Sequence, residues 1–301
     1  MRRGAAWVAA CALVLHAGMA QAGDAVGGAA FASEDSDGTR VLLASTSWDF
    51  DFRDHDDYGG IELERARFAP PGVAATTAGR VYYRFARPAG AWQWRGRVGT
   101  DGDTVLGSVS VHNDAPRRQE YFLERDVVAT RQGLERDLHA TFAGAAYDLP
   151  LDDRHVLTGL VGLQHFTGGN RRLHLRGRYV AVVNEGWGLS AQLRTRYFRS
   201  SDPHQFDYYS PRWYAEVLPV LQLRRFRGGW MYQVAAGAGR QADSDAGWRD
   251  ARLLEASVTS PPTEADWRFR ASFHHSTTPG GVASDGGYRY RQFQLEATRA
   301  F

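Results

Sequence analysis

Apolar and polar residues alternate along most of residues 39–301. Successive side chains of a β-strand point to opposite faces, so a period of two predicts strands with one apolar face and one polar face. No stretch repeats its apolar residues at the spacing of an amphipathic helix. The pattern predicts an all-β chain, and it is clearest over residues 42–50, 92–98, 173–183, 189–197, 213–223 and 267–273.

The polar face of these strands is rich in arginine. A soluble sandwich would turn this face to the outside, whereas a membrane barrel turns it to a wet lumen and its apolar face to lipid. Trp and Tyr near strand ends favour the barrel, because these residues concentrate at membrane interfaces. We therefore expect the lumen to be lined by Arg95, Arg97, Arg172, Arg176, Arg178, Arg194, Arg196, Tyr214, Glu216, Arg268 and Arg270.

Turn-rich connections between the strands alternate in length when counted back from residue 301. The shorter are 150–153, 184–187 and 225–229, and the longer are 200–210, 241–248 and 276–287. Transmembrane barrels have short periplasmic turns and longer outer loops. At about 17 residues for a strand and its connection, we expect a transmembrane antiparallel up-and-down β-barrel of about 16 strands, with 14 as the nearest alternative.

The amino-terminal residues have the pattern of a secretory signal peptide. Two arginines precede an apolar run over residues 5–15, and Ala20-Gln21-Ala22 supplies the small residues of a cleavage site. We expect residues 1–22 to be removed, residues 23–38 to form a flexible segment or the first strand, and residues 39–301 to form the barrel. No later stretch has the ~20 apolar residues of a membrane-spanning helix.

The net charge and the number of cysteines indicate which partners and which covalent or metal links the chain can have. The chain has 36 basic and 34 acidic residues, and without Arg2 and Arg3 the two numbers are equal at 34. Such a balance does not favour nucleic acid as a partner. The single cysteine, Cys11, lies in the expected signal peptide, so the rest of the chain has no disulfide and no thiolate metal ligand. We expect no cofactor.

The last strand repeats the alternation and ends on an aromatic residue. Phe293, Leu295 and Phe301 share its apolar face, while Gln294 and Glu296 share the other. This strand resembles the carboxy-terminal signal that the assembly machinery of outer-membrane barrels reads. The resemblance implies that the strand closes the barrel at the periplasmic side, and that the protein lies in the bacterial outer membrane in contact with lipid.

A few short motifs suggest chemistry in the connections. Asp202 with His204 resembles the Asp-x-His pair of omptin-type proteases, with Asp49 and Asp51 as partner carboxylates. His274 and Ser276 resemble the His-x-Ser of lipid A deacylases. Neither motif is accompanied by a second one from its family, so we expect no enzyme.

Three acidic clusters could supply oxygen ligands to calcium, at residues 35–38, 54–57 and 101–104. None has the spacing of a known calcium loop, and Asp and Gly are also the residues that turns use. We expect no metal site.

The arginine-rich lumen has two interpretations. The arginines could attract anionic or hydroxyl-rich solutes, or they could form ion pairs with Glu120, Glu124, Asp126, Glu216 and Glu296 that hold the wall together. Aromatic residues of the same parity could contact sugar faces or pack within the wall, and these are Tyr82, Phe198, Tyr214, Tyr288 and Tyr290.

The central part of the chain carries a succession of four segments, residues 124–133, 149–155, 166–172 and 208–211. Their order and spacing resemble the carboxy-terminal barrel of exopolysaccharide export porins, both those that export poly-N-acetylglucosamine and those that export cellulose. The likeness covers roughly residues 59–301. In that family a periplasmic helical-repeat region receives the polymer, and we expect no such region in this chain. Either a separate scaffold or synthase serves the barrel, or the barrel stands alone and carries another solute.

The resemblance implies an outer-membrane channel that exports a polysaccharide or a related hydrophilic solute. The arginines would repel a cationic glucosamine polymer, so we expect a neutral or anionic glycan. An outer-membrane hydrolase and a non-transporting structural barrel are the alternatives.

Overall fold

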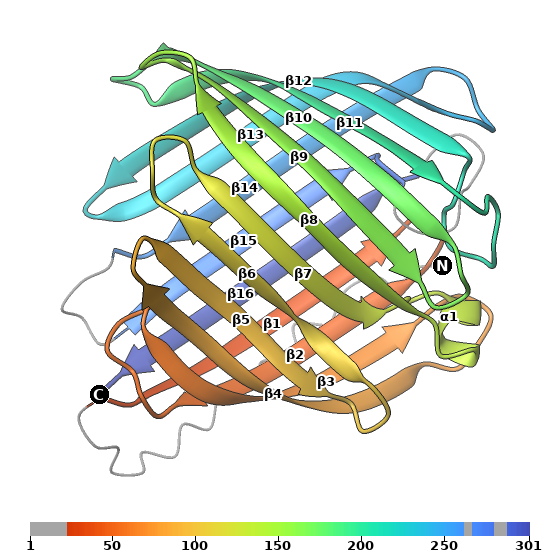
Figure 1. The fold of residues 1–301 in the computed structure, drawn as a ribbon, viewed down its shortest axis with the longest axis horizontal. Helices are drawn as coiled ribbons and strands as arrows, with labels where there is room; N and C mark the ends of the chain where they lie inside the picture. The colour runs from red at the N-terminus through yellow and green to blue at the C-terminus, as the bar shows by residue number, and fades with distance from the viewer. Residues whose placement is uncertain (1–22, 262–266, 280–287) are drawn as a thin grey trace, which may run out of the picture.

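The computed structural model describes residues 23–261, 267–279 and 288–301. The expected signal peptide therefore lies outside the described residues. Within them the chain forms one closed antiparallel barrel of sixteen strands, in which every strand pairs with its neighbours in sequence and β1 pairs with β16 (Figure 1). The expected fold and the expected strand number are confirmed.

The strands are long and of similar length, as a membrane barrel requires. They are β1 (Ala25–Asp35), β2 (Arg40–Asp49), β3 (Tyr58–Ala69), β4 (Thr76–Ala89), β5 (Trp92–Thr100), β6 (Val105–Asn113), β7 (Gln119–Val127), β8 (His139–Pro150), β9 (His155–Phe166), β10 (Arg171–Asn184), β11 (Leu189–Ser200), β12 (Trp213–Arg227), β13 (Trp230–Asp243), β14 (Arg249–Thr259), β15 (Trp267–Ser276) and β16 (Tyr290–Ala300).

The last strand closes the barrel against the first. Ala30 of β1 lies opposite Leu295 of β16, and the register continues to Ala25 opposite Ala300. Residues 25–35, part of the segment for which the sequence left two alternatives open, therefore form β1. We call the end of the barrel that carries residues 25 and 300 the terminal end, and the other the far end.

The connections differ between the two ends. Tight turns lie at the terminal end, such as Gly228-Gly229 between β12 and β13, whose φ angles of 55° and 79° suit a two-residue hairpin. The far end carries the long connections 128–138, 201–212 and 277–289. This is the asymmetry that outer-membrane barrels show between their periplasmic and outer sides.

One short helix interrupts the all-β pattern. Helix α1 (Arg131–Glu135) lies in the connection between β7 and β8, and the Thr130 side chain caps it by accepting the N–H of Gly133 at 3.1 Å. Five residues are too few to show an apolar stripe, which is why the sequence pattern did not reveal it. None of the helices in the described residues is long and apolar enough to cross a membrane.

The outer surface of the barrel is apolar along its middle. Leu63, Leu163 and Leu221 are among many large apolar side chains that are about half exposed or more, at 56%, 51% and 60%. In a soluble protein such a continuous apolar surface would be unstable in water, whereas in a barrel it faces hydrocarbon.

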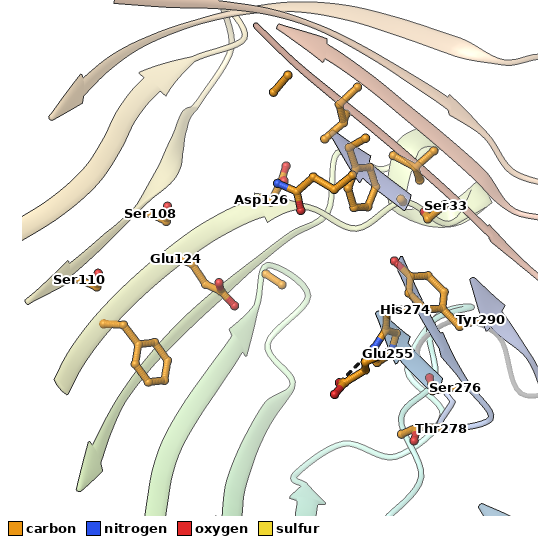
Figure 2. Close-up of a pocket in the computed structure, with 18 of the residues that line it drawn as sticks. Ser33, Ser108, Ser110, Glu124, Asp126, Glu255, His274, Ser276, Thr278 and Tyr290 are labelled. Atoms are coloured by element: carbon orange, nitrogen blue, oxygen red, sulfur yellow. Dashed lines mark ion pairs between the residues drawn. The ribbon is translucent and has the colours of Figure 1, made fainter. Parts of the chain in front are cut away.

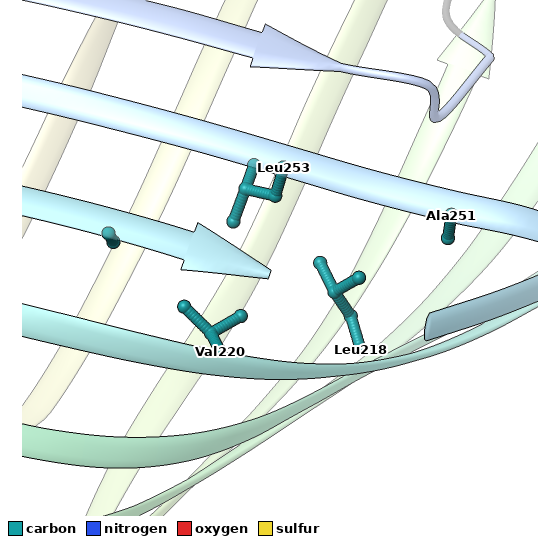
Figure 3. Close-up of a cluster of buried hydrophobic side chains, with 5 residues drawn as sticks. Leu218, Val220, Ala251 and Leu253 are labelled. Carbon is teal, nitrogen blue, oxygen red and sulfur yellow. The ribbon is translucent and has the colours of Figure 1, made fainter. Parts of the chain in front are cut away.

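The inward face is less uniformly polar than its arginines suggest. Leu218, Val220, Ala235, Ala251 and Leu253 form a buried apolar cluster on β12, β13 and β14 (Figure 3). On β12, apolar residues therefore occupy both faces of the strand over residues 217–221. The expectation of a charged lumen holds for part of the wall only.

Candidate functional site in the barrel lumen

The described residues enclose a large cavity of about 1740 Å³ in the lumen. Its lining reaches from Arg224 and Gln233, near the terminal end, to Tyr208 and Tyr288, near the far end. Glu124 and Asp126 of β7 face this space, as do Glu255 and His274 of β14 and β15 (Figure 2). The cavity therefore follows the length of the barrel and is bordered by charged groups on several sides.

Strands β10 and β11 form an arginine ladder on the inner wall, made of Arg176, Arg178, Arg194 and Arg196. Arg176 lies directly opposite Arg196, and Arg178 directly opposite Arg194. Like charges in directly opposite positions destabilise a strand pair. Two such pairs in succession indicate that the positive charge serves something other than the stability of the wall.

Within the described residues, Arg194 is the only arginine of the ladder that forms an ion pair. Arg194 donates to both carboxylate oxygens of Glu255, at 3.1 and 3.0 Å. Within the described residues Arg176, Arg178 and Arg196 form no ion pair and no side-chain hydrogen bond, and Arg176 lies 5.7 Å from the centre of the Phe142 ring. Three guanidinium groups of the ladder are therefore available to a solute in the cavity.

The wall formed by β3, β4 and β5 uses its charges differently. Arg97 binds Glu62 at 2.7 Å and Glu64 at 2.9 Å, and Arg80 binds Glu64 at 3.0 Å. The side chains of Arg80 and Glu64 are 1% and 3% exposed. These groups form a closed network in which Arg80 and Arg97 both have a carboxylate partner.

The network extends along the wall in both directions. Arg80 also reaches Asp126 on β7 at 3.0 Å, and Arg84 lies 3.3 Å from Asp49 on β2. The lining residues expected from the sequence did not include Arg80 or Arg84, nor Glu64, the partner of Arg80 on β3. Both arginines have the same inward parity as Tyr82, which was expected there, so the signal was present in the alternation.

Arg172 continues the ladder in sequence and also borders the cavity, but its guanidinium group is held in a packed cluster. Its guanidinium group lies over the rings of Phe198 at 4.4 Å and Phe166 at 5.1 Å, and it donates to the backbone carbonyl of Tyr209. These contacts hold the β11–β12 connection, residues 201–212, against the inner wall at the far end.

Three of the four segments that carry the family resemblance meet at this connection. Tyr208 stacks on Phe166 with ring centres 4.2 Å apart, and Asn170 donates to the Tyr208 hydroxyl at 3.1 Å. Asp207 accepts the Thr130 hydroxyl and the Gln132 N–H, so it anchors the start of helix α1. The succession of segments in the sequence is thus one contact cluster in space, with residues 149–155 alone at the terminal end.

The two tyrosines of the connection are held as neutral donors. The Tyr209 hydroxyl donates to Asp243 at 2.6 Å. Burial raises the pKa of the Tyr208 hydroxyl and, more strongly, the pKa of the Tyr209 hydroxyl, where the adjacent Asp243 carboxylate acts in the same direction. Neither group titrates near neutral pH.

The other arginines predicted to line the pore have separate roles. Arg95 pairs with Asp56 in the β2–β3 connection at the terminal end. Arg270 borders the cavity from β15, and Arg268 lies further toward the terminal end on the same face, with no ion pair in the described residues. Arg97 belongs to the closed network described above. The arginines therefore do not act as one group.

Glu216 does not pair with an arginine in the described part of the chain. It accepts the hydroxyl of Tyr214 at 2.8 Å and that of Thr278. Tyr214 is fully buried, and its hydroxyl also lies 2.9 Å from the side-chain oxygen of Gln241. These contacts hold the far end of β12 and the β15–β16 connection together.

Most inward-facing aromatic residues pack within the wall. Tyr82, Phe198 and Tyr214 are 1%, 4% and 0% exposed, so they cannot offer a ring face to a passing sugar. Tyr288 and Tyr290 border the cavity at the far end. Of the two alternatives that the sequence left open, Tyr82, Phe198 and Tyr214 therefore follow packing within the wall.

The motifs that suggested hydrolysis are dispersed. Asp202 accepts the amide of Gln205, and His204 lies 3.4 Å from Asp245 instead of Asp202. Asp49 and Asp51 belong to the terminal end, opposite to the end that carries His204. The omptin-like set is not assembled.

His274 and Ser276 both point inward from β15 and border the cavity. His274 lies 3.4 Å from Glu255, the carboxylate that Arg194 holds. In the described residues no hydrogen bond joins the Ser276 hydroxyl to His274, so the pair lacks the contact by which a base activates a nucleophile.

The acidic clusters serve as turns and as arginine partners. Asp57 binds Arg53 at 2.8 Å and also Arg87, and these bonds lower the pKa of the Asp57 carboxyl group. Asp101 accepts the N–H groups of Asp103 and Thr104 at 3.2 and 3.1 Å. Across residues 23–261, 267–279 and 288–301, no group of three or more metal-binding side chains occurs.

Comparisons with known proteins establish the fold. No family model matches the sequence, and no curated protein does. Among solved structures, the chain is similar to a bacterial polysaccharide outer membrane secretin with a TM-score of 0.67 and 13% identity, over 92% of this chain and 98% of that one.

Two porin-like structures match more loosely. OccD1 (OprD) has a TM-score of 0.45 at 8% identity over 94% of this chain and 98% of its own. OccAB3 of Acinetobacter baumannii has a TM-score of 0.43 at 10% identity over 92% and 99%. At these identities the first match shows the fold alone, which is that of a bacterial outer-membrane barrel whose apolar outer face contacts lipid.

Proposed function

We propose that this protein is an outer-membrane channel that exports a neutral or anionic polysaccharide, or a related hydrophilic solute. The observation that carries the proposal is the set of three arginines without a carboxylate partner in the described chain, Arg176, Arg178 and Arg196, on the wall of a cavity that follows the barrel. The arrangement supports binding without covalent chemistry, because no nucleophile and base are joined in the described lumen.

The arginines suit solutes that carry carboxylates or many hydroxyl groups. A guanidinium group presents its donors in a planar fork that matches a carboxylate with two parallel hydrogen bonds. Transport requires contacts weak enough to release the solute, and partly hydrated arginines on one wall provide such contacts. A cationic polymer would be repelled by the same wall.

Two further observations support a saccharide as the solute. The barrel has the fold of a polysaccharide outer membrane secretin over nearly its whole length. Three segments that resemble export porins also meet in one cluster at the far end. We infer that a separate periplasmic scaffold or synthase delivers the polymer, and that the outer-membrane assembly machinery recognises Phe293, Leu295 and Phe301 on the closing strand.

Planar-bilayer recording tests the channel. In a salt gradient we expect the purified barrel to conduct and to prefer anions over cations. The triple variant Arg176→Gln/Arg178→Gln/Arg196→Gln should lose most of this preference, whereas Arg95→Gln, whose charge is paired with Asp56, should retain it. No conductance in the full protein or in variants with a shortened β11–β12 connection would contradict the proposal.

Oligosaccharides added to the same recordings test the solute. A uronate oligosaccharide should block the current at lower concentration than a neutral one, and a glucosamine oligomer should not block it at all. Equal block by all three would leave a channel but would remove the argument from the arginine ladder. Peptide and lipid A cleavage by the wild type, lost in His204→Ala or His274→Ala, would favour a hydrolase instead.

A further inference from the structure

A row of basic side chains crosses the outer surface of five neighbouring strands near the far end. Arg125 on β7 lies opposite Thr141 on β8, Thr141 lies opposite His165 on β9, and His165 lies opposite Arg171 on β10. Arg199 on β11 stands beside Arg171, opposite Leu173. We call Arg125, His165, Arg171 and Arg199 the outer basic row.

The row lies directly above the apolar band that faces lipid. Two residues nearer the terminal end on the same strands stand Leu123, Leu163 and Leu173, which are 51%, 51% and 45% exposed. An arginine on the lipid side costs about 2–4 kcal/mol at the middle of the bilayer and little at its surface. The change from leucine to arginine therefore marks the level of the lipid head groups.

The row has almost no partners in the described part of its own chain. Arg125 donates to the Thr141 hydroxyl at 2.8 Å. In the described residues, the side chains of His165, Arg171 and Arg199 form no hydrogen bond and no ion pair, and all three are exposed. Neighbouring strands lie about 4.8 Å apart, so the row presents its donors over a span of about 19 Å.

Arginines on the outer face of β13 and β14 are different. Arg240 lies 3.3 Å from Asp250, and Arg252 lies 3.8 Å from the same carboxylate. Both arginines have a carboxylate partner within the chain, which they share, so they differ from Arg171 and Arg199 of the outer basic row. A molecule outside the described chain would have to supply the negative charge that balances the outer basic row.

We propose that the outer basic row binds the phosphate groups of a phosphorylated glycolipid in the outer leaflet, of the lipid A type. The long connections at the far end put this end on the outer side. Arginine forms two-pronged hydrogen bonds with phosphate, and the adjacent leucines contact the acyl chains. The site is independent of what the lumen transports.

Binding of lipid A to the detergent-solubilised barrel, followed by native mass spectrometry, tests the site. The triple variant Arg125→Gln/Arg171→Gln/Arg199→Gln should bind lipid A at least about ten-fold more weakly than the wild type. The matched control Arg240→Gln/Arg252→Gln should stay within about two-fold of the wild type, because these two arginines share the Asp250 carboxylate and lie outside the row. Faster migration of the unheated protein on a gel verifies that each variant is folded.

Dephosphorylated lipid A separates phosphate binding from acyl contact. The wild type should bind it about as weakly as the triple variant binds intact lipid A. Equal binding of the two lipids by the wild type, or an equal loss in the triple variant and the control, would overturn the proposal.

Discussion

The wall of β3, β4 and β5 and the wall of β10 and β11 both carry inward-facing arginines. Carboxylates bind Arg80 and Arg97 of the first wall, whereas in the ladder of the second wall only Arg194 has a carboxylate partner in the described chain. Arg80 and Arg97 share Glu64, and Arg97 also binds Glu62. Arg176 of β10 and Arg196 of β11 lie directly opposite one another on adjacent strands, and neither forms an ion pair in the described chain. The same residue type on the same barrel face thus stabilises one wall and leaves the other charged.

The two walls differ because the arginines of the first are buried beside carboxylates, whereas those of the second face the wet lumen. A buried ion pair is retained at a large desolvation cost, and removal of one partner leaves an unpaired charge. Exposed charges on a wet surface cost little, and they remain free to bind. We therefore expect variants of the first wall to change stability and variants of the second to change selectivity.

The largest effect is expected in the closed network. Glu64→Ala leaves Arg80 without its buried partner and should lower the free energy of unfolding by about 3–5 kcal/mol. Urea titration in lipid vesicles, followed by tryptophan fluorescence, measures this value. The double variant Glu64→Leu/Arg80→Met should recover most of the loss, and a single-variant loss below ~1 kcal/mol would contradict the assignment.

Arg172 should contribute to stability and not to selectivity, although it lies on β10 together with Arg176 and Arg178. Arg172→Gln removes the contacts with Phe198, Phe166 and Tyr209 and should lower the free energy of unfolding by about 1–3 kcal/mol. Anion selectivity in bilayer recordings should stay close to that of the wild type. A large loss of selectivity without a loss of stability would put Arg172 back among the solute-binding residues.

A variant of Glu255 tests whether arginines without an ion-pair partner create the preference for anions. Glu255→Gln releases Arg194 and should raise the preference for anions, at a cost of about 1 kcal/mol in stability. Glu296→Gln is the matched control, since it removes a lumenal carboxylate that accepts from Gln294 and binds no arginine in the described chain. If both variants raised selectivity equally, the net lumen charge would matter more than the ladder.

The smallest effect is expected within the ladder. Arg176→Gln relieves the repulsion from Arg196, so the free energy of unfolding should stay unchanged or rise by less than ~1 kcal/mol. The same urea titration measures it. A clear loss of stability would mean that Arg176 supports the wall through its contact with Phe142.

Much of the fold could be predicted because the alternation of apolar and polar residues can be recognised within each strand by itself. Leu173 and Leu175 against Arg176 and Arg178 assign the two faces of β10 without any knowledge of its neighbours. The lengths of the connections then gave the strand number. Helix α1 could not be predicted, because its five residues are too few to show an apolar stripe and Asp207, which anchors its start, is distant in sequence.

The candidate site could be predicted only in part. Parity placed Arg97 and Arg176 on the same inner face, but it could not tell that Arg97 has two carboxylate partners and that Arg176 has none in the described chain. Those pairings depend on which strands meet and in what register. The choice between solute contact and wall packing for Tyr82, Phe198 and Tyr214 was open in the sequence for the same reason, since burial depends on side chains of adjacent strands.

The sequence by itself determined which residues face lipid and which face the lumen, because that choice is made within each strand by alternation. Closure of β1 on β16 and the register between strands decided which charges became neighbours. Electrostatic energy depends steeply on distance and burial, so only the tertiary structure could separate the neutralised wall from the arginine ladder.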